Sequence, residues 1–438
     1  MRALKHREPA LLALIYLHVA ACCVSLFYVT FYYSGYQLLK YDPAQLLPSL
    51  LTIAPLAALA FVFAQVRFSF GYFLGFGFYT MVLGYLWLSR SSTLDYDHTV
   101  GNISAAVSLV AFLAPALFAT APINHPLRLS KTGLERLLVL VLVLSLVVII
   151  AGAFFNFHLV GMAQIYAYRD QLEFPVLLRY AIGSVVNALL PFAFACYVAL
   201  GKPLRAFSAL VLLCLFYPIM LTKLTLFAAV WLVFLWLLGK FFEARIVVVL
   251  SLLLPLAIGD GLLPLLASGA LSYDHFILYF GTVNFRMIAV PSIALDLYND
   301  FFSRHELTHF CQIQVLKSFV ACPYNEYLSV IMSKSYNLGA VNASLFTTEG
   351  IASMGPTLAP LSALACGLVI ALANRLSAGL PPRFVLLSAG LLFQIMLNVP
   401  MTTSLLSYGA GILFLLWSIT PREIFEQSEI AAGDRRAA

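Results

Sequence analysis

The sequence predicts an all-α membrane protein, a polytopic bundle of about 12 transmembrane helices with one large extracytoplasmic loop. Of its 438 residues, 62% are hydrophobic and only 10% are charged, whereas a soluble domain carries about 25% charged residues. Apolar runs of 17 or more residues recur along the chain, and each is long enough to span a bilayer as a helix. Segments such as "LLVLVLVLSLVVII" lack the alternation of a membrane β-barrel.

The predicted spans follow one another closely in the first two thirds of the chain. The seventh and eighth are short and meet at Lys223, which predicts a tight or re-entrant hairpin. The twelve spans are 10–33, 46–66, 68–89, 103–123, 137–156, 177–199, 206–221, 223–239, 246–267, 356–377, 384–399 and 401–419.

Charge predicts the orientation of the bundle. With a cytoplasmic N-terminus, 16 of the 25 lysines and arginines fall in short inner segments. The positive-inside rule therefore places both termini in the cytoplasm. The net charge of +6 is a topology signal, and nothing indicates a nucleic-acid partner. The chain divides into helices 1–9 (residues 1–267), a periplasmic loop (268–355), helices 10–12 (356–420) and a cytoplasmic tail (421–438).

The loop from about Ser268 to Gly355 dominates the outer side. It is too long for a connector and too apolar for a disordered linker. We expect amphipathic helices that lie on or dip into the outer leaflet. The loop gathers many charged and histidine side chains: Asp274, His275, Arg286, Asp296, Asp300, Arg304, His305, Glu306, His309 and Glu349.

Some patterns in this loop suggest function. The stretch "NASLFTTEGIASMGPTLAPLSALACG", residues 342–367, is small, hydroxylated and glycine-rich before its apolar half, and it holds Glu349. "YFGTVNFRMIAVP" places Arg286 in apolar surroundings, where an unpaired guanidinium is costly. His305 and His309 are four residues apart, on one face of a helix. No acid accompanies them at an HExxH offset, so we expect no metal site.

Two shorter outer loops also carry candidates. Arg169 and Arg179 bracket a turn that ends at Pro175. Arginine binds phosphate through bidentate hydrogen bonds, and interfacial snorkelling is the alternative. Asp95 and Asp97 form a D-x-D, a pattern that holds a divalent cation in many glycosyltransferases.

The cysteines leave one question open. Cys311 and Cys322 both fall in the large loop, and the other five lie in predicted spans. A disulfide in an oxidising periplasm and two free thiols both fit this pattern. The chain has no CxxC spacing, no P-loop and no Rossmann glycine pattern, so we expect no structural metal and no nucleotide cofactor.

The layout of residues 160–420 resembles that of bacterial O-antigen polymerases, the Wzy-type oligosaccharide repeat-unit polymerases. "YAYRDQ" opens an outer loop before "SVVNALLPFAF", and a short hairpin follows with a lysine in "YPIMLTKLTLF". One large loop then ends in the glycine-rich approach to a late span, and "NVPMTTSLLSYGAGILFLLW" forms the last hairpin. Related O-antigen ligases often carry a His-Asn pair near the end of the large loop, where this chain reads Tyr324-Asn325.

The resemblance implies an enzyme of lipopolysaccharide or related polysaccharide biosynthesis in the bacterial inner membrane. Such enzymes polymerise undecaprenyl-diphosphate-linked repeat units at the periplasmic face, and a chain-length regulator is a candidate partner. Cations must stabilise charge on the departing diphosphate, for which the candidates are Arg169, Arg179 and Arg286. A base must accept the acceptor proton, for which the candidates are Glu349, Asp274 and His305. Tyrosines suited to stacking on sugars are Tyr166, Tyr168, Tyr273, Tyr279, Tyr324 and Tyr336.

Other functions fit parts of the pattern. Another polyprenyl-phosphate-dependent glycosyltransferase would use the D-x-D with Mg²⁺ or Mn²⁺, and an O-antigen ligase would share the layout. A transporter of lipid-linked glycans predicts internal repeats and charged residues at mid-membrane. We see no clear repeat between the halves.

Overall fold

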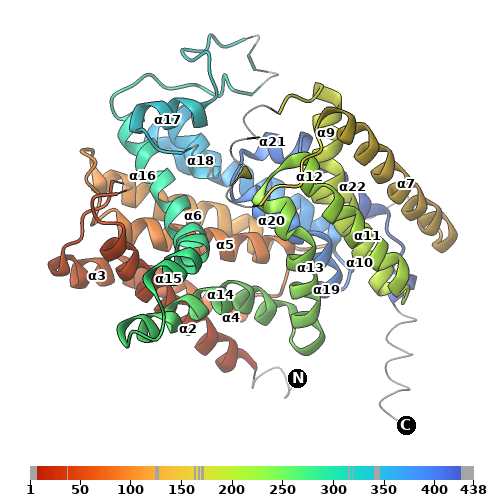
Figure 1. Cartoon of the computed structure of the whole chain (residues 1–438), viewed down its shortest axis with the longest axis horizontal. Coiled ribbons are helices and arrows are strands. Elements are labelled where there is room, and N and C mark those ends of the chain that lie inside the picture. The colour runs from red at the N-terminus through yellow and green to blue at the C-terminus, as the bar shows by residue number, and fades with distance from the viewer. Residues whose placement is uncertain are drawn as a thin grey trace. The chain divides into compact units, whose positions relative to one another are not determined.

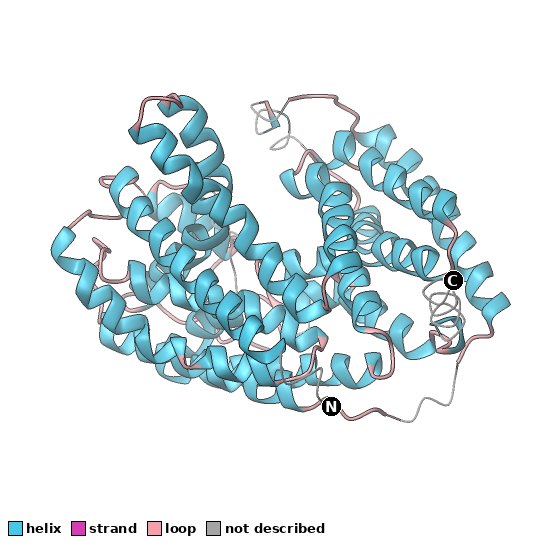
Figure 2. Ribbon diagram, turned by 90° about the horizontal axis from the view of Figure 1, so that it is seen from below, coloured by secondary structure: helices cyan, strands magenta, loops and turns pink. Residues whose placement is uncertain are grey.

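The protein is a bundle of helices, as predicted. The computed structural model describes residues 7–36, 38–123, 128–161, 164–165, 168, 172–313, 316–317, 319–339 and 346–425. The structure is 76% helix, and the part of the chain just defined contains no strand beyond an isolated bridge (Figure 2). Eleven of the described helices are long and apolar enough to cross a membrane. The prediction of a multi-pass membrane protein is therefore supported at this level.

The chain forms two compact units, which we describe separately. Unit 1 comprises residues 1–118, 245–371 and 397–400, and unit 2 comprises 119–244, 372–396 and 401–438. Both units are assembled from distant segments, so they cut across the predicted division of the chain at residues 267 and 355. The predicted boundaries separate the membrane spans from the loop between them. The two units instead group the helices that pack against one another.

The helices of unit 1 include most of the predicted early spans and the large loop. They are α2 (Arg7–Tyr32), η1 (Pro43–Gln45), α3 (Leu46–Ala57), α4 (Leu59–Gln65), α5 (Phe70–Leu88), α6 (His98–Phe118), α14 (Ala244–Ala267), α15 (Tyr273–Phe280), η3 (Gly281–Ala289), α16 (Val290–Phe302), α17 (Leu328–Tyr336) and most of α18 (Phe346–Ser377).

Helix α5 is the centre of unit 1, and every one of its residues is buried. Ser69 caps its start by accepting a hydrogen bond from the Tyr72 amide at 3.1 Å, which satisfies one of the free N–H groups at a helix start. Glycines bring neighbouring helices close. A Cβ at Gly75 would lie 2.6 Å from Leu113 of α6, and one at Gly84 would lie 2.9 Å from the Ile288 carbonyl of η3.

One end of unit 1 is marked by paired loops. Residues 38–42, after α2, lie against residues 89–97, after α5. The Leu39–Ser92 bridge joins them, and the Lys40 amide donates to the Ser91 carbonyl at 2.8 Å. We call this the paired-loop end. At the opposite end, Arg245 donates to the carbonyls of Ala64 and Val66 at 3.0 and 3.2 Å.

A continuous apolar helix of 30 residues, Tyr273–Phe302, occupies the first part of the predicted large loop. Its first turns pack on the end of α2, where the Phe276 ring lies 5.1 Å from the Tyr32 ring. Its last turns reach the loop after α5, where Asp296 accepts hydrogen bonds from Ser92 and Tyr96. Both ends therefore contact the paired-loop end, and the helix lies across it, rising over α5 and α14 in Figure 1.

The helices of unit 2 surround α10, most of which is buried. They are α7 (Lys131–Phe155), α9 (Val176–Ser184), η2 (Val185–Leu189), α10 (Leu190–Ala199), α11 (Pro203–Leu215), α12 (Tyr217–Met220), α13 (Lys223–Phe241), α19 (Pro382–Ser388), α20 (Gly390–Met396), α21 (Met401–Leu406) and α22 (Ala410–Ile419). The predicted hairpin at Lys223 is present as a tight turn, in which Leu221 adopts a left-handed conformation with φ 47°.

The last two predicted spans are not continuous helices. The structure has the four short helices α19 to α22 where the sequence predicts spans 384–399 and 401–419. Gly409 explains one break, because its φ of 78° is left-handed and its neighbour Ser184 leaves no room for a Cβ. The Trp231 indole of α13 donates to the Gly390 carbonyl at 3.0 Å and so joins this region to the rest of unit 2. Within the region, the Trp417 indole of α22 donates to the Ser388 hydroxyl of α19 at 2.9 Å.

Candidate functional site

Acidic residues line one face of α16 at the paired-loop end of unit 1. Asp296 and Asp300 are four residues apart on α16, so both lie on one helical face, and Arg304 follows just beyond the end of the helix at Phe302. Asp296 is 4% exposed and Asp300 is 1% exposed. Buried carboxylates of this kind need hydrogen-bond donors, and the surrounding loops provide them.

Asp296 is held by residues from the loop after α5. The Ser92 hydroxyl donates to Oδ2 and the Tyr96 hydroxyl donates to Oδ1, each at 2.5 Å. Tyr96 also contacts the Tyr85 hydroxyl at 2.9 Å. Burial and the neighbouring Asp296 raise the pKa of Tyr96 far above its usual value. Its phenol therefore stays a neutral donor throughout the physiological pH range.

Asp300 ties α17 to α16. The Tyr336 hydroxyl donates to Oδ2 at 2.5 Å, and Arg304 forms an ion pair with Oδ1. Burial and this hydrogen bond raise the pKa of Tyr336 well above its usual value. Both oxygens of Asp300 thus have partners, so its role in this arrangement is to position the segment that carries Tyr336.

The first residues of α18 form a polar segment beside this cluster. Gly355 interrupts the helix with φ 77°, a conformation that favours glycine. The residues before it fold back on those after it, since a Cβ at Gly350 would lie 3.0 Å from the Ala359 carbonyl. We call residues 347–354 the α18 entry segment.

The α18 entry segment is buried although it is rich in hydroxyl groups. Thr347 and Thr348 are both 0% exposed, and Ser353 is 2% exposed and contacts the Thr308 hydroxyl at 2.9 Å. The Thr347 hydroxyl has no hydrogen-bond partner among the described residues. Unsatisfied polar atoms in a buried position call for an explanation, and a polar ligand at this segment would supply one.

Glu349 lies in the α18 entry segment and is half-buried. It is close enough to Tyr298 of α16 and to Cys366 of α18 to act on both electrostatically. Cys366 is eleven residues beyond the break at Gly355, so Glu349 sits alongside the spanning part of α18. The sequence analysis placed Glu349 just before a predicted span, and its role as a base stays a prediction.

The other two predicted bases lie elsewhere on the surface of unit 1. Asp274 is exposed in the first turn of α15. His305 is exposed, its ring stacks on the Phe301 ring with centroids 3.9 Å apart, and its Nδ1 donates to the Phe301 carbonyl at 2.8 Å. Because a carbonyl only accepts, Nε2 of the neutral ring keeps its lone pair. His305 adjoins the Asp300–Arg304 pair, whereas Asp274 does not.

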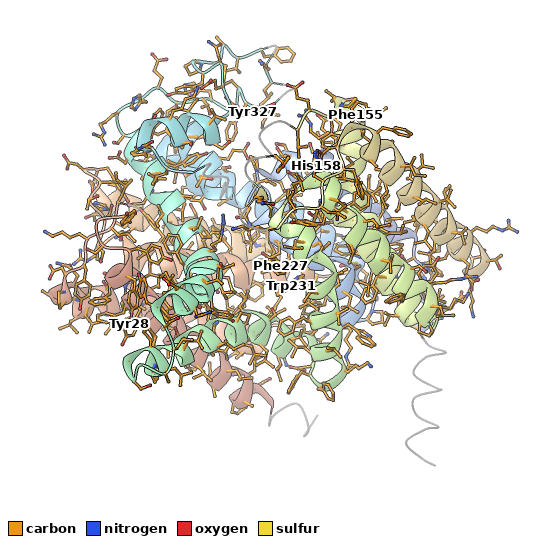
Figure 3. The ribbon with its side chains drawn as sticks, viewed as in Figure 1. Tyr28, Phe155, His158, Phe227, Trp231 and Tyr327 are labelled. Atoms are coloured by element: carbon orange, nitrogen blue, oxygen red, sulfur yellow. A yellow bond between two sulfur atoms is a disulfide. The ribbon has the colours of Figure 1, made fainter. Side chains whose placement is uncertain are left out.

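The predicted sugar-stacking tyrosines divide between the units. Tyr336 and Tyr324 belong to unit 1, where the Tyr324 hydroxyl donates to the Glu306 carbonyl at 2.7 Å. Burial and the charge of Glu306 raise the pKa of Tyr324. Tyr168 belongs to unit 2, is 40% exposed, and has its ring 4.9 Å from that of His158 (labelled in Figure 3). Tyr166 lies outside the described residues.

Two of the three predicted diphosphate-binding arginines are described, and both are at the surface. Arg286 is exposed on η3, so the cost of burying its guanidinium does not arise. Arg179 is exposed on α9 of unit 2. Arg169 lies outside the described residues.

The structure gives the two patterns that were considered as metal ligands a local description. Asp97 begins α6 by accepting hydrogen bonds from the amides of Thr99 at 2.9 Å and Val100 at 3.1 Å, which is a capping role. His305 and His309 do not share a helical face, because α16 ends at Phe302 and His309 has φ 47°. No group of three potential metal ligands occurs among the described residues.

The open question of the loop cysteines has a clear answer in the structure. A disulfide joins Cys311 and Cys322, whose Cα atoms are 5.2 Å apart. It closes a loop that follows α16 directly and precedes α17. The remaining five cysteines are free.

Sequence reasoning named Asp296 and Asp300 as part of the large loop but did not place them in a site, and it missed Tyr96 and Ser92. A signal was present in the four-residue spacing of Asp296 and Asp300, which places both on one helical face. Comparison of the chain with protein-family models, with curated proteins and with solved structures finds no match.

Proposed function

We propose that the chain is a glycosyltransferase of the bacterial inner membrane, which polymerises undecaprenyl-diphosphate-linked repeat units at the periplasmic face. The α18 entry segment is the observation that carries this proposal. It places a half-buried carboxylate, Glu349, and buried hydroxyls beside a spanning helix. A lipid-linked saccharide needs polar groups at this depth, because its tail lies in the bilayer while its sugar reacts near the surface.

Two independent features support a periplasmic position for the paired-loop end. The Cys311–Cys322 disulfide follows α16, whose residues contact that end, and disulfides persist in oxidising compartments. Arg67 and Arg245 lie near the opposite end, as the positive-inside rule requires of a cytoplasmic side.

The proposed reaction transfers the growing glycan from its lipid diphosphate to a hydroxyl of the next repeat unit. The acceptor oxygen bonds to the anomeric carbon of the donor, and the bond from that carbon to the diphosphate oxygen breaks. Glu349 accepts the proton of the acceptor hydroxyl. Arg169, Arg179 and Arg286 remain the candidates for stabilising negative charge on the departing lipid diphosphate.

The structure bears on one of the alternatives. In a D-x-D glycosyltransferase, Asp97 would have to bind the cation while its Oδ1 caps α6. A ligase would transfer a finished glycan once, so its loss would remove glycan from the final acceptor without shortening the lipid-linked chains. The length distribution of the lipid-linked glycans therefore distinguishes the two enzymes.

The test replaces Glu349 by Gln in cells and follows the glycan ladder on a gel. Loss of a general base slows a reaction by about a hundredfold to ten-thousandfold, so the ladder should collapse to single repeat units at an unchanged protein level. Glu326→Gln is the matched control, because Glu326 is exposed and pairs only with Lys334 among the described residues. A full ladder in Glu349→Gln would remove Glu349 from the reaction.

A further inference from the structure

A carboxylate lies inside α14, a helix long and apolar enough to cross the membrane. Asp260 is seven residues from the last residue of this helix, Ala267, or about 10 Å along its axis. It is half-buried, and no ion pair joins it to any described residue. Ionisable residues in spanning segments are rare and are functional by default. The proposed glycosyl transfer makes no use of this one.

The chain builds a specific polar setting for Asp260. The Ser25 hydroxyl of α2 donates to Oδ1 at 2.6 Å, and the Asn284 amide of η3 lies 3.3 Å from the same atom. Asn284 is 0% exposed and sits in a π-helical segment, a rare geometry that is frequent at functional sites. Gly259 makes room for it, because all three atoms nearest to a Cβ there would belong to Asn284.

Polar side chains continue from Asp260 along one face of α2. His18, Cys22 and Ser25 follow at helical spacing, and all are 0% exposed. His18 Nε2 lies 2.9 Å from the Thr80 hydroxyl and 3.5 Å from the Cys22 sulfur. Its Nδ1 atom is buried without a hydrogen-bond partner among the described residues, although His18 lies near the middle of the first candidate span.

We propose that Asp260 is a proton-binding site at membrane depth, which exchanges its proton in the working protein. An uncompensated carboxylate in this setting must be neutralised, by a proton or by a cation. Around the Asn284 amide nitrogen only three oxygens gather, from Ser25, Leu256 and Asp260, at 2.9, 3.0 and 3.3 Å. An amide donor already occupies the centre of that set, where a sodium ion would have to sit.

The surroundings of Asp260 favour a proton over other charges. From α2, Cys22 lies within electrostatic reach of Asp260, with Cys23 beside it. From α15, the Tyr279 hydroxyl donates to the Pro255 carbonyl of α14. The described groups that act on the Asp260 carboxyl are Ser25 and Asn284, and neither is cationic.

The test uses dicyclohexylcarbodiimide, a lipophilic reagent that adds to protonated carboxyl groups within a bilayer. The full-length protein in liposomes is treated over a pH series, and the adduct at Asp260 is quantified by peptide mass spectrometry. On the alkaline side of the midpoint, labelling should rise roughly tenfold for each unit of pH lowered, as a single titrating proton requires. Asp260→Asn should carry no adduct in this peptide.

One further variant, a control residue and a sodium condition make the result decisive. Ser25→Ala removes a donor that stabilises the carboxylate, so the midpoint of labelling should move up by about one pH unit. Exposed Asp274 reports on the fold and should react only with a water-soluble carbodiimide. Labelling of Asp260 that is absent at every pH, or that does not change with pH, would overturn the proposal. Protection by sodium at constant pH would overturn it as well, in favour of a cation site.

Discussion

Replacing Tyr336 by Phe tests whether the Asp300 hydrogen bond holds α17 on α16. The substitution removes only the hydroxyl that donates to Asp300 Oδ2 at 2.5 Å. Hydrogen bonds to charged groups contribute about 1.5–3 kcal/mol. Asp300 keeps its ion pair with Arg304 in the variant, so we expect the lower part of this range, about 1.5–2 kcal/mol.

This loss should appear locally. Opening of a surface segment is governed by its own free energy, which can be far below that of global unfolding. A loss of about 1.5–2 kcal/mol raises the open population of α17 roughly tenfold to thirtyfold. Hydrogen–deuterium exchange of residues 328–336 should accelerate by this factor, while α5 and α10 keep the exchange rates of the wild type.

Tyr327→Phe is the matched control for this experiment. Tyr327 directly precedes α17, is 73% exposed (Figure 3), and donates no hydrogen bond to a described residue. Its variant should exchange as the wild type does. Equal exchange of residues 328–336 in Tyr336→Phe and Tyr327→Phe would show that the Asp300 contact does not hold this segment.

Three further predictions follow from the site and the loop. A cysteine introduced at Ser303 in a cysteine-free background should react with a membrane-impermeant thiol reagent from the periplasm, and one at Ser130 should not; the reverse pattern would invert the proposed orientation. Alkylation of the denatured protein should modify five thiols before reduction and seven after it, because Cys311 and Cys322 are joined; seven before reduction would exclude the disulfide in cells. Arg169→Lys should reduce polymerisation nearly as much as Arg169→Ala, by about a hundredfold to a thousandfold, because a diphosphate site uses the guanidinium fork; a normal ladder in both variants would assign Arg169 to the membrane interface.

Hydropathy predicted most of the helices because a chain in lipid must satisfy its backbone hydrogen bonds within each spanning segment. The same rule explains where prediction failed. Helices α19 to α22 are short because the chain breaks at positions such as Gly409, where close packing within unit 2 accompanies a left-handed backbone. Hydropathy does not detect such breaks. The helix Tyr273–Phe302 is as apolar as a span, yet both its ends contact the paired-loop end.

The candidate site was predictable only in part. Glu349 could be singled out because a lone acid in a small-residue stretch before a span is unusual. The hydrogen bond from Tyr96 to Asp296 joins residues 200 positions apart, and no local pattern encodes such a contact. Asp97 was considered as a cation ligand because aspartate is common both in cation sites and at helix starts. In the structure it caps α6, a role for which aspartate is preferred.

Polymerisation by the purified protein tests the proposed function most directly. The wild-type chain and Glu349→Gln would be reconstituted in liposomes with undecaprenyl-diphosphate-linked repeat units and excess EDTA, and the products separated by length. Because we expect arginines to act at the diphosphate, the wild type should extend the glycans without a divalent cation, and Glu349→Gln should leave single units. If the wild type formed no chains under these conditions but did so when Mg²⁺ or Mn²⁺ was restored, the metal-independent mechanism would be wrong. If it formed none with the cations present, the chain would not be a polymerase of these substrates.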